Sequence, residues 1–321
     1  MTRLKSSFIY LANAVNDLRA DGATLAVVLA PLVLLAAVCV LPDAINLQHA
    51  VAEHFTPGAR HVGWLTVQEP YAPAPAAAET RPLVPWWAVG TLNILALALT
   101  FAANLLVLCA LKRLKAGARE PQVIGEVIAT WREAIKLAPA FLWIVVLQVT
   151  APTVAYFLWT ADIYVAPWYL AFAVYMFEVA FMVVAGLLFL WLYFSGYALV
   201  FENQRSFRAL LRSRDLLRKR FFRVAIRIVV FLAVWSGYDS WAAAVFFVAS
   251  WILGPVGFVT GYFWSFFFAV ELTAVAVTYM LGTFFMLAGY RLYQDLIEIA
   301  EAATAPAVAV DGSGSASAAG G

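Results

Sequence analysis

Long apolar stretches dominate the pattern of hydrophobic and polar positions along the chain. Six of them approach or exceed the roughly 20 residues that a helix needs to cross a hydrocarbon core of about 30 Å. They cover residues 23–41, 86–111, 138–159, 169–201, 222–252 and 262–290. A bilayer offers no partners for backbone N–H and C=O groups, so such runs predict helices. The expected fold class is therefore all-α, a polytopic membrane-embedded helical bundle.

The connecting segments are less regular. Ser236-Gly237-Tyr238-Asp239-Ser240 interrupts the fifth stretch and predicts either one kinked span or a span followed by a re-entrant piece. Residues 42–85 are rich in proline, which predicts a short helix near 43–55 followed by an irregular loop. The tail 302–321 has a disordered composition, which leaves residues 1–301 as a single transmembrane domain.

A repeating unit is the most informative regularity. An amphipathic segment precedes the first, third and fifth spans, so each unit reads as amphipathic helix, span out and span back, beginning near residues 6, 122 and 204. In the last two units the returning helices match in register. The matched pairs are Glu178 with Glu271, Gly196-Tyr197 with Gly289-Tyr290, and Glu202 with Asp295. The pattern indicates internal duplication.

Basic residues set the expected orientation. Lys and Arg concentrate in 1–22, 112–137 and 202–223, whereas the loops on the other side contain only Arg60 and Arg81. The positive-inside rule then places both termini in the cytoplasm, and we expect a multi-pass protein of a bacterial inner membrane. Composition agrees, since the chain is 64% hydrophobic and 12% charged, against about 25% charged in soluble domains.

Ionisable groups inside the apolar stretches are candidates for a polar site. Glu178, Asp239 and Glu271 lie toward the outer half, and Asn93 takes the analogous place in the first unit. A charge at membrane depth costs roughly 2.5–3.5 kcal/mol on insertion scales. These side chains either form a carboxylate layer that binds a cation or relays protons, or are protonated or hydrogen-bonded groups that fix helix packing. Both readings stay open.

The third amphipathic segment is the candidate for lipid contact. Its basic residues lie directly before a span, where each attracts anionic headgroups by about 1 kcal/mol. They are Arg205, Arg208, Arg212, Arg218, Lys219 and Arg220. A basic run also suits nucleic acid, but apolar residues along one face of a membrane-tethered helix favour the lipid interface, so no nucleic-acid partner is expected.

Other reactive residues form no recognisable site. Cys39 and Cys109 lie in apolar runs, and the spacing of His49, His54 and His61 fits no common metal motif. Phosphate-binding, dinucleotide-binding and nucleophile motifs are also missing from the sequence. We therefore expect no cofactor, no metal and no enzymatic activity.

Two short segments resemble a known family. Residues 202–213, ENQRSFRALLRS, and the closing Tyr290-Arg291-Leu292-Tyr293-Gln294-Asp295-Leu296 are similar to segments of bacterial six-span proteins of the glycerophosphoryl diester phosphodiesterase membrane-domain type. In some members that domain is fused to a catalytic barrel, which this sequence lacks. The resemblance implies a membrane module of poorly defined role, and it transfers no catalytic residue.

Three functions are compatible with the sequence. The first is a non-enzymatic module that organises lipids or partner proteins, including further copies of itself. The second is a transporter or channel that uses the intramembrane carboxylates. The third, a lipid-modifying membrane enzyme, would need catalytic residues that no motif reveals.

Overall fold

A computed structural model describes residues 4–55, 84–117, 123–160, 168–238, 241 and 263–304. These parts of the chain are helical and contain no strand, and six helical segments in them are long and apolar enough to cross a membrane. The prediction of an all-α, six-span architecture is confirmed. The chain is a multi-pass membrane protein.

The helices follow the predicted order. Their bounds are α1 Ser7–Phe55, α2 Trp86–Lys115, α3 Val123–Thr160, α4 Trp168–Leu192, α5 Ser195–Phe201, α6 Ser206–Arg218 and α8 Phe263–Thr304. One more membrane-length helix, Phe221–Tyr238, lies between α6 and α8.

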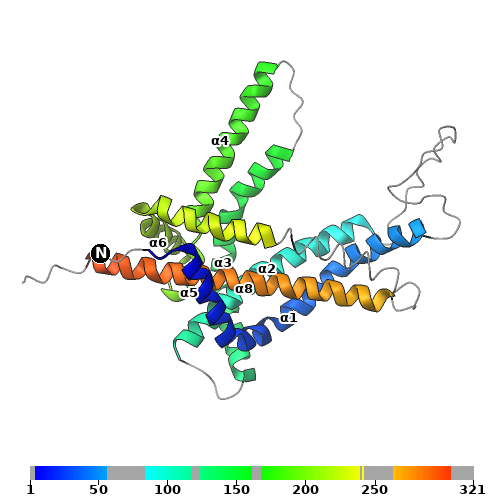
Figure 1. Cartoon of the computed structure of the whole chain (residues 1–321), viewed down its shortest axis with the longest axis horizontal. Coiled ribbons are helices and arrows are strands. Elements are labelled where there is room, and N and C mark those ends of the chain that lie inside the picture. The colour runs from blue at the N-terminus through cyan, green and yellow to red at the C-terminus, as the bar shows by residue number, and fades with distance from the viewer. Residues whose placement is uncertain are drawn as a thin grey trace, which may run out of the picture.

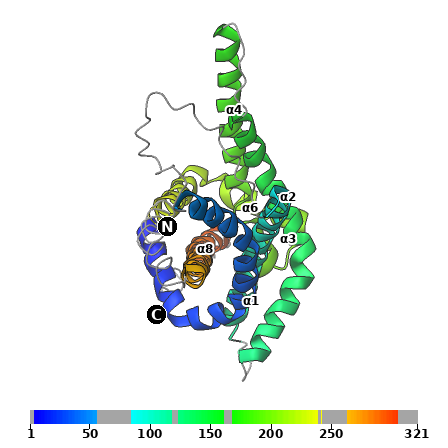
Figure 2. The ribbon, with the colours of Figure 1, turned by 90° about the vertical axis from the view of Figure 1, so that its right-hand side faces the viewer.

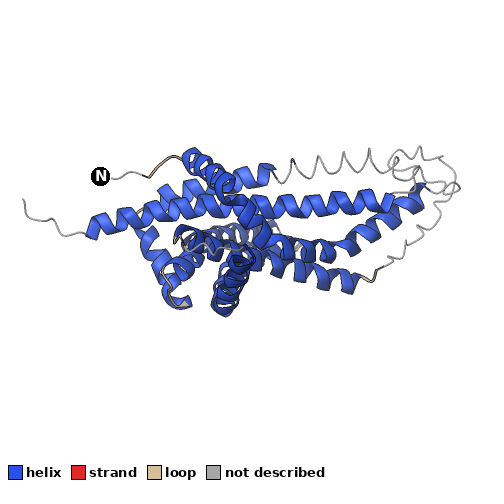
Figure 3. Cartoon of the chain, turned by 90° about the horizontal axis from the view of Figure 1, so that it is seen from below, coloured by secondary structure: helices blue, strands red, loops and turns tan. Residues whose placement is uncertain are grey.

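The helices form two groups. Helices α1, α2 and α8 pack along one another, and α8 lies beside α1 for much of its length (Figures 1 and 2). Helix α4 and the second half of α3 form a hairpin that points away from this group (Figure 1). Seen from below, the described residues are almost entirely helical, with only short turns between them (Figure 3). Helix α5 therefore sits where the two groups meet, against both α2 and α3.

Two of the predicted amphipathic segments are not separate helices. Each of α1 and α3 runs from its amphipathic part into its span without interruption, and each contains prolines, among them Pro31 and Pro139. Within the third unit, a short turn at residues 219–220 does separate α6 from Phe221–Tyr238. Residues 43–55 are helical as predicted, as the end of α1. The interruption expected at 236–240 reaches past the described residues, since Asp239 and Ser240 lie outside them.

The fourth predicted span, 169–201, corresponds to the membrane-length segment Phe172–Phe201, but a turn divides it into two helices. The chain turns at Tyr193 and Phe194 and continues as α5. Ser213 of α6 stabilises the break, because its hydroxyl donates to the Trp191 carbonyl at 2.6 Å and accepts from the Phe194 N–H at 3.2 Å. Ser213 is fully buried, so these bonds satisfy backbone groups that water does not reach. No hydropathy pattern reveals this insertion.

Close packing joins α5 to α8. Tyr197 of α5 donates a hydrogen bond to the Met286 carbonyl at 3.0 Å. Its ring lies over the Gly289 Cα, where an added Cβ would overlap the hydroxyl and come within 3.1 Å of Cζ. One turn further along, Phe201 and Tyr290 stack with ring centroids 4.5 Å apart. A glycine at position 289 is therefore what allows α5 to approach α8.

Replacing this glycine should destabilise the bundle. Gly289→Ala forces Tyr197 out of its position, and overpacking of this kind costs typically 1–3 kcal/mol. Gly282→Ala is the matched control on the same helix, because its Cβ would come no closer than 3.8 Å to Trp235. Both changes gain the same helix propensity, so their difference isolates the steric effect. Thermal unfolding in detergent should show a lower midpoint for Gly289→Ala only, and equal midpoints would contradict the packing described.

Candidate functional site at the basic end of the bundle

Most of the polar interactions between the described helices gather at one end of the bundle. We call it the basic end and define it by Lys5, Lys112, Lys115, Arg212 and Arg291, each of which pairs with a carboxylate from another helix or from the end of the preceding one. It is the end at which the basic amphipathic segments lie. The carboxylates that pair with these bases determine which interactions remain possible at the basic end.

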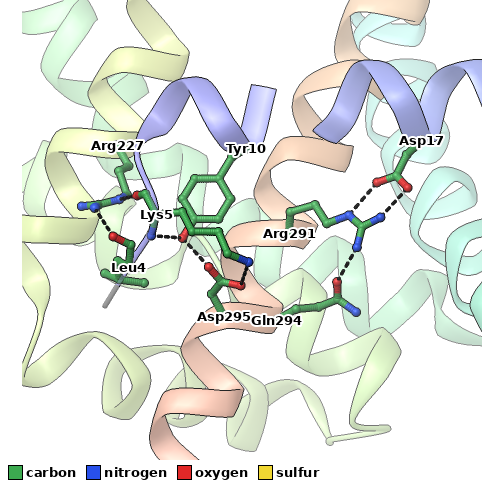
Figure 4. A network of polar contacts seen from close by, with 8 residues as sticks. All are labelled: Leu4, Lys5, Tyr10, Asp17, Arg227, Arg291, Gln294 and Asp295. Atoms are coloured by element: carbon green, nitrogen blue, oxygen red, sulfur yellow. Dashed lines mark hydrogen bonds and ion pairs between the residues drawn. The ribbon is translucent and has the colours of Figure 1, made fainter. Parts of the chain in front are cut away.

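The first cluster joins α1, α2 and α8. Asp17 of α1 accepts two hydrogen bonds from the Arg291 guanidinium, at 2.7 Å from Nε and 2.5 Å from Nη2. Lys115 of α2 reaches the same carboxylate at 3.2 Å and lies 4.0 Å from Asp21. The Asp17 side chain is only 8% exposed, so its charge depends on these partners rather than on water (Figure 4).

The second cluster joins the two ends of the chain. Asp295 of α8 accepts a hydrogen bond from the Tyr10 hydroxyl at 2.7 Å and pairs with Lys5 at 3.2 Å. Arg227, from the helix Phe221–Tyr238, donates to the carbonyls of Leu4 and Lys5 at 3.1 and 2.8 Å (Figure 4). The start of the chain is thus held by residues that come more than two hundred positions later.

The third cluster lies around the turn between α5 and α6. Glu202 pairs with Arg212 at 3.0 Å and accepts a hydrogen bond from Tyr293 of α8 at 2.5 Å. Next to it, Asn203 has a φ of 51°, a left-handed conformation that asparagine tolerates better than most residues. The Asn203 side chain accepts from Lys112 at 2.8 Å, and Lys112 also pairs with Glu133 of α3 at 2.8 Å.

Three of these contacts share one pattern. The returning helix of each predicted unit ends in a polar contact with the first helix of the next unit: Lys112 with Glu133, Glu202 with Arg212, and Asp295 with Tyr10. The last of them connects the third unit back to the first and closes the chain on itself. The chemistry of these groups is that of paired charges that fix helix ends.

The predicted lipid-contact residues lie on or next to α6. Arg205, Arg208, Arg218 and Lys219 are exposed, whereas Arg220 is half-buried. Arg212 differs, because Glu202 holds it in an internal ion pair. Exposed apolar side chains lie beside the bases, among them Phe207 and Phe222. Contact with headgroups stays a prediction, and Arg212 is the member whose charge is already matched within the protein.

The predicted carboxylate layer is only partly visible. Glu178 is half-buried on α4, in the hairpin that points away from α8, and Asn93 is exposed on α2. Glu271 lies in α8, but its side chain is outside the described residues, as is Asp239 altogether. A joint site of these four residues therefore stays a prediction.

The cysteines and histidines are the remaining candidates from the sequence. Cys39 and Cys109 are buried free thiols, as expected from their apolar surroundings. Within the described part of the chain, no group of three or more His, Cys, Asp or Glu residues could hold a metal ion. The side chains of His49, His54 and His61 lie outside it.

Comparison with protein-family models, with curated proteins and with solved structures gives no match for this chain. The resemblance of residues 202–213 and 290–296 to the glycerophosphoryl diester phosphodiesterase membrane-domain family therefore remains an expectation from the sequence.

Sequence reasoning missed the central role of Asp17 and Arg291. Both lie just beyond predicted spans, where a charged residue looks ordinarily solvated. One signal was available, because Asp17 and Asp21 fall one turn apart near the apolar face of the first amphipathic segment. The α8 partner of Asp17, Arg291, lies 274 residues away in the sequence, and no local pattern indicates such a pair.

Removing the Asp17 charge should loosen the basic end. Asp17→Asn leaves Arg291 and Lys115 without their shared carboxylate, and a hydrogen bond to a charged group contributes about 1.5–3 kcal/mol. The matched control is Asp215→Asn on α6, whose side chain is exposed and forms no ion pair within the described residues. Unfolding in detergent should give a clearly lower midpoint for Asp17→Asn and a nearly unchanged one for the control. A drop of the same size in both variants would mean that net charge, not the pair, matters.

Proposed function

We propose that this protein is a non-enzymatic membrane module that organises anionic lipids, and through them partner proteins, in a bacterial inner membrane. In this proposal the basic end and both termini face the cytoplasm. The proposal rests chiefly on one observation, which is the arrangement of exposed charge and exposed apolar surface on α6.

Helix α6 combines two features of a helix that lies at the lipid interface. Its bases Arg205, Arg208 and Arg218 are exposed and none of them forms an ion pair within the described residues. Phe207 and Leu211, on the same helix, are 67% and 42% exposed. Large apolar side chains beside free positive charges are favourable where acyl chains and anionic headgroups meet.

Burial along the chain supports the three-unit repeat that underlies this proposal. Four positions are buried in each unit at a constant spacing between units: Tyr10, Ala14, Leu25 and Leu29; Glu126, Thr130, Phe141 and Val145; Ala209, Ser213, Val224 and Ile228. In the same register Phe8, Ile124 and Phe207 are 74%, 70% and 67% exposed. Each unit would thus present one large apolar side chain to lipid just before its span, and the module would have three interfacial anchors.

The closed basic end also favours a module over a transporter. Its charges pair between helices and fix their ends, as Asp17 does with Arg291 and Glu202 does with Arg212. A transporter would rely on the carboxylates of the spans instead. Flux measurements in proteoliposomes distinguish the two functions. We expect no cation or proton flux, whereas a flux lost in Glu178→Gln/Glu271→Gln would favour the transporter.

Neutralising the exposed bases of α6 tests the proposal. Wild-type protein extracted with its native lipids should be enriched in anionic over zwitterionic phospholipids relative to the bulk membrane. Changing Arg205, Arg208, Arg218 and Lys219 to Gln should abolish most of this enrichment, since each base contributes about 1 kcal/mol. Lipid mass spectrometry gives the ratio.

The control changes Arg205, Arg208 and Arg218 to Lys and Lys219 to Arg. These changes conserve the charge and should keep the enrichment. Wild-type protein whose bound lipids match the bulk membrane in composition would overturn the proposal.

A further inference from the structure

Two apolar grooves on the surface of the protein share an unexpected composition. Each is lined by one tryptophan, by further apolar side chains and by two basic residues one helical turn apart. Their volumes are about 710 and 410 Å³, within the range of known small-molecule sites.

The larger groove lies between α1 and α3. Pro31 of α1 lines it together with Trp131 and Ile135 of α3. Trp131 is held in place because its indole N–H donates to the Val28 carbonyl of α1 at 3.3 Å. The basic residues of this groove are Arg132 and Lys136.

The smaller groove lies between α4, α6 and the helix that follows α6. Leu187 and Trp191 of α4 line it, together with Phe222. Its basic residues are Arg214 and Arg218. The Arg214 guanidinium lies 6.0 Å from the centre of the Trp191 ring, a cation–π arrangement that orients it over the groove.

The four bases are available for a ligand. No acidic side chain pairs with Arg132, Lys136, Arg214 or Arg218 among the residues that the structure describes, and all four are exposed. In contrast, the neighbouring Glu133 and Arg212 have their partners in the protein. Each pair of bases also directly precedes a span predicted from the sequence, where contact with lipid phosphates is expected. An apolar groove that begins at two unpaired positive charges matches a molecule with an anionic head and an apolar tail.

We propose that each groove is a site for one anionic phospholipid, with an acyl chain along the tryptophan and the phosphate between the two bases. This inference rests on the proposed function and refines it, from a diffuse basic surface to two discrete sites. Only one of the four bases, Arg218, belongs to the set predicted from the sequence. The groove between α1 and α3 adds a second site on a different unit.

Native mass spectrometry of the full chain, released from nanodiscs of mixed phosphatidylglycerol and phosphatidylcholine, tests the proposal. The wild type should retain two phosphatidylglycerol molecules. Arg132→Gln/Lys136→Gln and Arg214→Gln/Arg218→Gln should each lose one of them, with an affinity at least about tenfold lower for that site. The controls Arg132→Lys/Lys136→Arg and Arg214→Lys/Arg218→Lys keep the charge of each groove, and both should retain two lipids.

The outcomes separate the two levels of the proposal. If both groove variants retain lipid like the wild type while Arg205→Gln/Arg208→Gln, which changes two bases outside both grooves, loses it, the discrete sites are wrong and the basic surface stands. If the wild type retains phosphatidylcholine equally well, both proposals fail. Displacement of the retained lipid by millimolar glycerol 3-phosphate would show that the bases bind a soluble phosphate ligand, and would overturn a lipid site. All variants change exposed side chains, and unchanged helicity by circular dichroism verifies their folding.

Discussion

The requirement that a buried charge must have a partner governs the basic end of this protein. Asp17 is nearly inaccessible to water, and its carboxylate is stable only because Arg291 and Lys115 approach it from two other helices. Those contacts fix α1, α2 and α8 relative to one another. Lipid surrounds the spans and provides little force to hold apolar helices together, so polar pairs near the helix ends and close packing have to determine the arrangement.

Close packing provides the second part of that arrangement. Tyr197 lies against Gly289, and Phe201 stacks on Tyr290, so α5 and α8 are joined by aromatic side chains that pack over a glycine. The turn that separates α4 from α5 is what points Tyr197 in this direction, and it depends on Ser213 from a third helix. The path of one helix is thus set by a hydroxyl that is distant in the sequence.

The sequence predicts the spans well because hydrocarbon allows few alternatives for an apolar run of about 20 residues. It fails where the structure depends on a particular neighbour. The run through Tyr193 and Phe194 is as apolar as the rest of the span. The hydroxyls of Ser213 and Ser195 make a break there favourable, because they bond to the backbone on either side of the turn. In the sequence Arg212 looks like the other predicted lipid-contact residues. It is nevertheless the one among them that forms an ion pair within the described residues, with Glu202. Charge pattern shows which segment is basic, but not which of its charges the fold neutralises.

The two segments on which the expected family resemblance rests, 202–213 and 290–296, meet in space. Tyr293 donates to Glu202, and Phe201 next to that glutamate stacks on Tyr290. Their residues hold the helix ends together and do not line either groove. These two segments therefore contribute to the contacts between helix ends.

Several polar partners of the N-terminal segment are synthesised late. Arg227, Arg291 and Asp295 follow the residues that they contact, Lys5, Asp17 and Tyr10, by more than two hundred positions, which at about 5–20 residues per second corresponds to a delay of roughly 10–55 s. During that interval Asp17 can pair with Lys115 but not with Arg291, and the carbonyls of Leu4 and Lys5 lack Arg227. The contacts that hold the N-terminal segment can therefore be complete only after the last helix has been synthesised.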